Sequence, residues 1–204
     1  MIAVSAVAAY IVLDVIAQLL PPHYSAVHQP ESNLGVGPYS WVMNLNFLVR
    51  GVTGATIAWA VFTKATRTRQ KVGAALLAVW AACSALLSVI HTDVSSGSLA
   101  TTDLTTQGTI HVALAFIGFA CAAVGTLTVG TGLSNHPRAL HAVALSTAIA
   151  LLLFLAATVT TDLFGLFERL FIATVLAWTT LTALSLTTAA LDHHTALPDP
   201  LGAR

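Results

Sequence analysis

Long apolar runs separated by short polar connections dominate the sequence. A helix needs about 20 consecutive apolar residues to cross the hydrocarbon core of a bilayer. Six runs meet this requirement, at 1–20, 40–63, 71–91, 109–130, 138–161 and 169–190. The pattern therefore predicts an all-α polytopic membrane protein. We expect one domain of six transmembrane helices over residues 1–190 and a short tail over residues 191–204.

Basic residues are unevenly divided between the two sides of the predicted bundle. One side holds the connections near 64–70 and 131–137, and in or beside them lie Lys64, Arg67, Arg69, Lys71 and Arg138. Short loops rich in Lys and Arg stay in the cytoplasm. We therefore expect this side and both termini to be cytoplasmic. The outer side then consists of the connections at 21–39, 92–108 and 162–168.

Composition supports this class and excludes others. Hydrophobic residues make up 56% of the chain and charged residues 8%, with mean hydropathy +0.84, whereas a soluble domain is about 25% charged. The formal net charge is +0, so no basic surface suggests a nucleic-acid partner. Abundant Ala, Leu, Thr and Val with few Lys indicate a bacterial source. We expect a multi-pass protein of the bacterial cytoplasmic (inner) membrane, surrounded by membrane lipids.

Arg50 is the most unusual residue of the apolar runs. It lies in the stretch MNLNFLVRG, residues 43–51, together with Asn44 and Asn46. A charged side chain inside a bilayer is costly and needs a partner. Asp14 lies at a compatible depth, about 9 Å from the outer end of the first run. We predict that Arg50 pairs with Asp14 and that the two asparagines complete the network, either as structural support or as part of a functional cavity.

The remaining polar and aromatic residues collect in the outer half. Six of the eight acidic residues are there: Asp14, Glu31, Asp93, Asp103, Asp162 and Glu168. Aromatic residues accompany them: Trp41, Phe47, Phe116, Phe119, Phe164, Phe167 and Phe171. Simpler interpretations stay open: Glu31 as a plain loop residue, Glu168 with Arg169 as an interfacial anchor pair, and the aromatic residues as an interface belt.

Several motifs resemble those of a known family. The segments are HYSAVHQPESNLGVGPYSWVMNLNFLVRG, SVIHTD, TTQGTIHVALAFIGF and GLFERLFI. They resemble the uncharacterised six-helix bacterial family catalogued as domain of unknown function 998. The resemblance covers most of the chain and lies in Ser32, Leu34, Gly35, Asn44, Phe47, Gly51, Asp93, Gly108, His111, Gly165, Glu168 and Arg169. It implies the fold and topology but no activity, and Arg50 departs from the pattern.

We expect an enzyme that acts on a hydrophobic substrate by acid–base chemistry, most concretely a membrane-bound terpene cyclase. Such a reaction needs a protonated carboxylic acid in an apolar site, aromatic walls that stabilise a carbocation and a base. Small membrane-bound terpene cyclases are similar at this loose level. The candidate catalytic residues are Asp14, Glu31, Asp93, His111 and Glu168. The candidate substrate-binding residues are Trp41, Asn44, Asn46, Phe47, Arg50 and Arg169.

Two other functions remain open at this point. A zinc-dependent membrane hydrolase could bind its metal through His23, His28, His91, His111 and Asp93, although no HExxH or HxxxH pair is present. A small transporter or assembly subunit could use Asp14 and Arg50 as a coupled pair. For the cyclase we expect no metal and no cofactor, and a hydrophobic or lipid substrate as the partner. The sequence does not indicate the oligomeric state.

Overall fold

The computed structural model describes residues 2–94, 103–129, 137–160 and 162–195. Within these residues it consists of helices, with no strand. The elements are α1 (Ile2–Leu19), η1 (Glu31–Gly35), α2 (Ser40–Lys64), α3 (Thr68–Leu87), α4 (Thr106–Val129), α5 (Pro137–Thr160) and α6 (Phe164–Thr195), where η1 is a short 3-10 helix. The predicted all-α class is confirmed.

Each α-helix contains a stretch that is long enough and apolar enough to span a membrane. The mean hydropathy of these six spans lies between 1.4 and 2.4. Large apolar side chains also cover the outside of the bundle: Val12 is 57% exposed, Trp59 70% and Leu152 66%. An extended apolar surface of this kind is rare on a soluble monomer but suits contact with lipid tails. The chain is therefore a multi-pass membrane protein.

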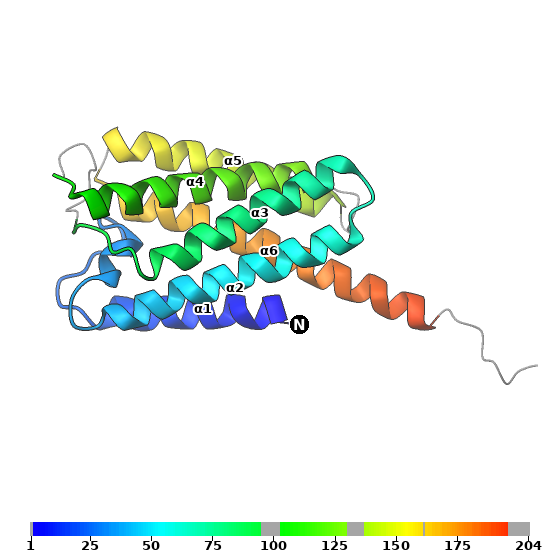
Figure 1. Cartoon of the computed structure of the whole chain (residues 1–204), viewed down its shortest axis with the longest axis horizontal. Coiled ribbons are helices and arrows are strands. Elements are labelled where there is room, and N and C mark those ends of the chain that lie inside the picture. Colours follow the sequence, from blue (N-terminus) through cyan, green and yellow to red (C-terminus); the bar gives the residue numbers. More distant parts are fainter. Residues whose placement is uncertain (1, 95–102, 130–136, 161, 196–204) are drawn as a thin grey trace, which may run out of the picture.

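The beginning of α1 and the far end of α6 lie at the same end of the bundle, opposite the segment 20–39 (Figure 1). An even number of spans produces this arrangement. Which end faces the cytoplasm stays a prediction from charge. Following that prediction, we call the end that holds residues 20–39 the outer end.

Three helices, α3, α4 and α6, begin at least three residues earlier than the apolar runs predict. α4 begins at Thr106 instead of 109. α3 starts at Thr68 because Gln70 Oε1 accepts the backbone N–H groups of Thr66 and Arg67, both at 3.0 Å. It ends at Leu87, before the predicted 91. α6 starts at Phe164 instead of 169 and continues to Thr195, beyond the predicted end at 190. The predicted tail over 191–204 is thus helical where it begins, and residues 196–204 lie outside the described residues.

Small residues allow α2 and α3 to pack closely. A Cβ atom on Gly54 would lie 2.9 Å from the Ala81 Cβ and from the Trp80 ring. A Cβ on Gly51 would lie 3.1 Å from the Ala81 carbonyl oxygen. These two glycines therefore bring the backbones of the two helices together, and this contact fixes the depth of the α2 residues relative to α3.

The outer segment 20–39 does not stay at the surface. Its backbone contacts the beginning of α6, where the Leu166 N–H donates to the Val27 carbonyl at 3.0 Å. A Cβ atom on Gly165 would overlap the carbonyl oxygens of Gln29 and Ala26. The segment then enters the bundle, so that Glu31 and Leu34 of η1 are 1% and 5% exposed. We call this segment the inserted loop.

Candidate functional site

Glu31 and Arg50 form a buried ion pair at the centre of the outer half. Arg50 Nη1 lies 3.4 Å from Glu31 Oε2, and the two residues are 2% and 1% exposed. The Tyr10 hydroxyl donates to Glu31 Oε1. Arg50 Nε donates to Ser84 Oγ at 3.2 Å. The network thus joins α1, η1, α2 and α3, and it satisfies charges that would be costly if they were buried alone.

The predicted pairing of Arg50 with Asp14 is therefore wrong. Asp14 instead accepts a hydrogen bond from Gln18 Nε2 at 2.6 Å, one turn further along α1. It is an electrostatic neighbour of Glu31, which occupies the position predicted for Asp14. The prediction failed because the inserted loop, which connects α1 to α2, brings the Glu31 carboxylate to the depth of Arg50.

The asparagines do not complete this network, contrary to the prediction. Asn44 Nδ2 lies 3.4 Å from His91 Nε2. Asn46 is 0% exposed, and neither polar atom of its amide has a hydrogen-bond partner among the described residues. Trp41 is 64% exposed, whereas the ion pair is buried. Phe47 does belong to the centre, because the Arg50 guanidinium carbon lies 4.9 Å from its ring centroid.

Glu168 and Arg169 hold the inserted loop in place. Glu168 Oε2 accepts the backbone N–H of Glu31 at 2.7 Å. Arg169 donates to the Ala26 carbonyl at 3.0 Å and to the Tyr24 hydroxyl at 2.5 Å. Burial raises the pKa of the Tyr24 phenol, although Arg169 beside it acts in the opposite direction. The two residues therefore bind the protein's own loop, which the interpretation as an interfacial anchor pair did not anticipate.

Asp93 supports the start of α4. Its Oδ2 accepts the Thr105 N–H at 2.7 Å, and the Thr105 hydroxyl donates to the same carboxylate at 3.0 Å. A Cβ atom on Gly108 would overlap this carboxylate. Asp93 does not line the pocket described below. Its contacts instead stabilise the beginning of α4.

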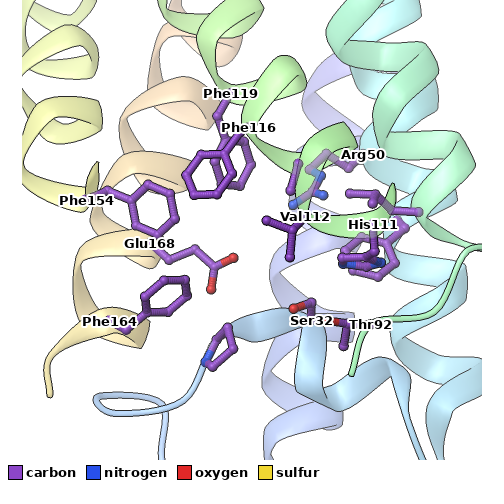
Figure 2. A pocket seen from close by; sticks show the side chains of 14 residues that line it. Ser32, Arg50, Thr92, His111, Val112, Phe116, Phe119, Phe154, Phe164 and Glu168 are labelled. Carbon is purple, nitrogen blue, oxygen red and sulfur yellow. The ribbon is translucent and has the colours of Figure 1, made fainter. Parts of the chain in front are cut away.

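A pocket opens between the ion pair and the beginning of α6 (Figure 2). The cavity has a volume of about 40 Å³ for the centres of water molecules. Its polar lining consists of Ser32, Arg50, Thr92, His111 and Glu168, and its aromatic lining of Phe47, Phe116, Phe119, Phe154 and Phe164. In Figure 2 the Glu168 carboxyl points into the space between the phenylalanine rings and the side of Arg50 and His111.

The aromatic wall of the pocket is one packed cluster. The ring of Phe119 lies 5.6 Å from that of Phe154 and 4.8 Å from that of Phe171. Phe164 lies 5.1 Å from Phe154. Phe154 was not among the aromatic residues predicted for the outer half. It could have been found from its spacing on one face with Thr158, since the two are four residues apart.

His111 turns one nitrogen to the backbone and leaves the other free. Nδ1 lies 2.5 Å from the Ile90 carbonyl oxygen. Nε2 is buried and has no hydrogen-bond partner among the described residues, and the residue as a whole is 3% exposed. The ring packs edge-on against Phe47, with centroids 6.1 Å apart.

The histidines do not converge on a metal site. Within the described residues, no group of three or more His, Cys, Asp or Glu side chains could hold a metal ion. His23 and His28 are exposed, and His28 Nδ1 lies 2.7 Å from the Asp162 carbonyl oxygen. His91 and His111 have the separate partners given above. The donor arrangement therefore does not fit the zinc-dependent hydrolase.

The chain matches one known protein family. Residues 3–185 match the family described as "Protein of unknown function (DUF998)". No curated protein and no solved structure matches the chain at a significant level. The loose resemblance to terpene cyclases thus finds no support in these comparisons. The match covers all six candidate spans except the edges of the first and last, and the chain belongs to the DUF998 family.

Proposed function

We propose that this protein is an integral membrane enzyme that transfers protons to and from an alkene-bearing, isoprenoid-type substrate. A membrane-bound terpene cyclase is the concrete form, and the bacterial cytoplasmic membrane is the proposed location. Glu168 is the proposed acid and His111 the proposed base. The observation that carries the proposal is the buried Glu168 carboxyl, which faces an aromatic pocket that is also lined by His111, whose buried Nε2 has no hydrogen-bond partner among the described residues.

The charges around the pocket favour a carboxyl group that holds a proton. Asp14, Glu31 and Glu168 lie in this cluster with Arg50 and Arg169. With all five ionised, one negative charge would stay uncompensated in a buried site, which is costly. Arg50 neutralises Glu31 directly. A proton on Glu168 removes the excess charge and supplies the acid at the wall of the pocket.

The phenylalanine rings supply the second requirement of such a reaction. The π faces of aromatic rings attract a positive charge, and four rings of one packed cluster line the pocket next to Glu168: Phe116, Phe119, Phe154 and Phe164. A carbocation formed by protonation of an alkene would lie among these rings, away from Arg50.

The cavity size sets a condition on the proposal. A volume of about 40 Å³ for water centres corresponds to about three water molecules. This space accommodates the reacting end of an isoprenoid but not a whole chain. Val112, Ala115 and Phe116 of α4 are partly exposed walls of the pocket. We infer that the rest of the substrate passes between α4 and α5 toward the lipid.

A second candidate function is a non-catalytic binding or assembly subunit. It is favoured by the internal partners of the polar groups, because Glu31, Arg50 and Arg169 all serve to hold the inserted loop. In that case Glu168 would also be a loop support. The two functions differ in what the carboxyl proton of Glu168 does.

Replacement of Glu168 by Gln separates them. The Gln side chain keeps an oxygen that accepts the Glu31 N–H but loses the acidic proton. We expect Glu168→Gln to fold and to lose turnover of linear isoprenoids in proteoliposomes, measured by mass spectrometry of extracted products. Asp162→Asn is the matched control, because Asp162 is an exposed carboxyl outside this cluster and does not line the pocket. Wild-type turnover by Glu168→Gln would refute Glu168 as the acid, and no product from the wild type would favour the subunit.

A further inference from the structure

The hydrogen bond from His111 to the backbone determines which ring nitrogen is free to accept. A carbonyl oxygen can only accept, so Nδ1, at 2.5 Å from the Ile90 oxygen, carries the hydrogen. In the neutral ring Nε2 is then an acceptor without a hydrogen. His111 lines the pocket, and this acceptor is buried and has no partner among the described residues. An unpaired buried acceptor is costly, so its position indicates a donor supplied by a ligand.

Arg50 lies on the same side of the pocket and can only donate. Its guanidinium carbon is 4.9 Å from the centroid of Phe47, and the Phe47 ring packs against His111. A ligand group between them must therefore donate to His111 Nε2 and accept from Arg50. A hydroxyl does both with a single oxygen atom.

Other polar groups fit this end of the pocket less well. A carboxylate or phosphate has no hydrogen for Nε2 and would lie in a cluster that already contains Glu31 and Glu168. An ammonium group would lie against Arg50. A ketone or an ether could accept from Arg50 but would leave Nε2 unpaired. The rest of the lining is aromatic or aliphatic apart from Ser32, Thr92 and Glu168, so the body of the ligand is apolar.

We propose that the pocket takes an apolar alcohol or phenol, whose hydroxyl donates to His111 Nε2 and accepts from Arg50. This inference names the substrate class of the same site and rests on the proposed function of the pocket. It adds that the isoprenoid carries a free hydroxyl at its buried end, with the alkene closer to Glu168. The proton that His111 takes as the base is then the hydroxyl proton, released when the oxygen bonds to the carbocation.

The test compares three probes of nearly equal size: geraniol, its methyl ether and geranic acid. Binding to the purified protein in detergent micelles is measured by titration calorimetry. Geraniol should bind at least about tenfold more tightly than the ether, because only the alcohol satisfies Nε2. Geranic acid at neutral pH should bind more weakly than geraniol.

Two substitutions locate the effect on Nε2. His111→Asn places an amide N–H near the position of Nδ1, so the bond to Ile90 can persist while the Nε2 acceptor is removed. Geraniol and its methyl ether should then bind to this variant with about equal affinity. His111→Gln places an amide oxygen near the position of Nε2 and should retain part of the preference.

The wild-type comparison is decisive even if the variants do not fold. Equal affinity for geraniol and its ether, or tighter binding of geranic acid, would overturn the inference. Absence of binding by all three probes would overturn it as well and would mean that the pocket holds water only. None of these binding results tests Glu168 as the acid. That role is tested separately by the turnover of Glu168→Gln.

Discussion

The buried ion pair between Glu31 and Arg50 makes a quantitative prediction about stability. We consider three variants: Arg50→Met, Glu31→Gln and the double variant. At 3.4 Å, and with an effective dielectric constant of about 20, two unit charges attract each other by about 5 kcal/mol. The cost of removing both charges from water offsets much of this attraction. Loss of one partner of a buried pair nevertheless costs about 3–5 kcal/mol, because the other charge stays uncompensated.

We expect Arg50→Met to be the more damaging single change, at the upper end of this range. It leaves the Glu31 carboxylate without its ion-pair partner and leaves Ser84 Oγ without its donor. Glu31→Gln should cost less, because the amide oxygen can still accept from Tyr10. The double variant should be at least about 2 kcal/mol more stable than the sum of the single changes predicts.

The assay is equilibrium unfolding in mixed detergent micelles, followed by far-UV circular dichroism. Arg69→Met is the matched control, since Arg69 is an exposed basic residue and its replacement should change stability by less than about 0.5 kcal/mol. Additive effects in the double variant, or single losses as small as that of the control, would refute the pair as a stabilising contact of the inserted loop.

Three further predictions follow from the loop and the orientation. Arg169→Lys should increase hydrogen exchange of residues 24–29, measured by mass spectrometry, because an ammonium cannot reach the Tyr24 hydroxyl and the Ala26 carbonyl together; unchanged exchange would contradict the role of Arg169 as a clamp. Gly165→Ala should lower stability by about 1–3 kcal/mol, because the added methyl group overlaps the inserted loop. Gly35→Ala should be nearly neutral, because its added Cβ would have its nearest neighbour at 3.4 Å. Equal thermal unfolding temperatures for these two variants would contradict the prediction. In intact cells, His23→Cys should react with a membrane-impermeant maleimide and Arg69→Cys should not, and the reverse labelling would invert the predicted orientation.

The helices could be predicted from the sequence because each depends on a local property. A span of about 20 apolar residues must satisfy its own backbone in lipid, and a helix does so whatever its neighbours are. The errors lie at the ends, where polar residues continue a helix. Gln70 caps the start of α3 from within a stretch that reads as a connection, and the first turns of α6 contain Glu168 and Arg169.

The partner of Arg50 could not be predicted in this way. The sequence showed that a buried cation needs an acceptor, and the structure supplies one, but from a different residue. Glu31 lies in a polar stretch without helical periodicity, so no pattern indicates that this stretch enters the bundle. The insertion depends on contacts between residues far apart in the chain, such as Glu168 with the Glu31 N–H.

Solvent deuterium incorporation tests proton transfer by Glu168 most directly. The protein in proteoliposomes is incubated with geraniol and longer linear isoprenoid alcohols in D₂O, and the recovered lipids are analysed by mass spectrometry. We predict that the wild type places deuterium on a former alkene carbon and that Glu168→Gln places none, while Asp162→Asn, at an exposed carboxyl outside the pocket, retains the activity. Deuterium incorporation by Glu168→Gln at the wild-type rate, or none by the wild type with any of these alcohols, would contradict the account.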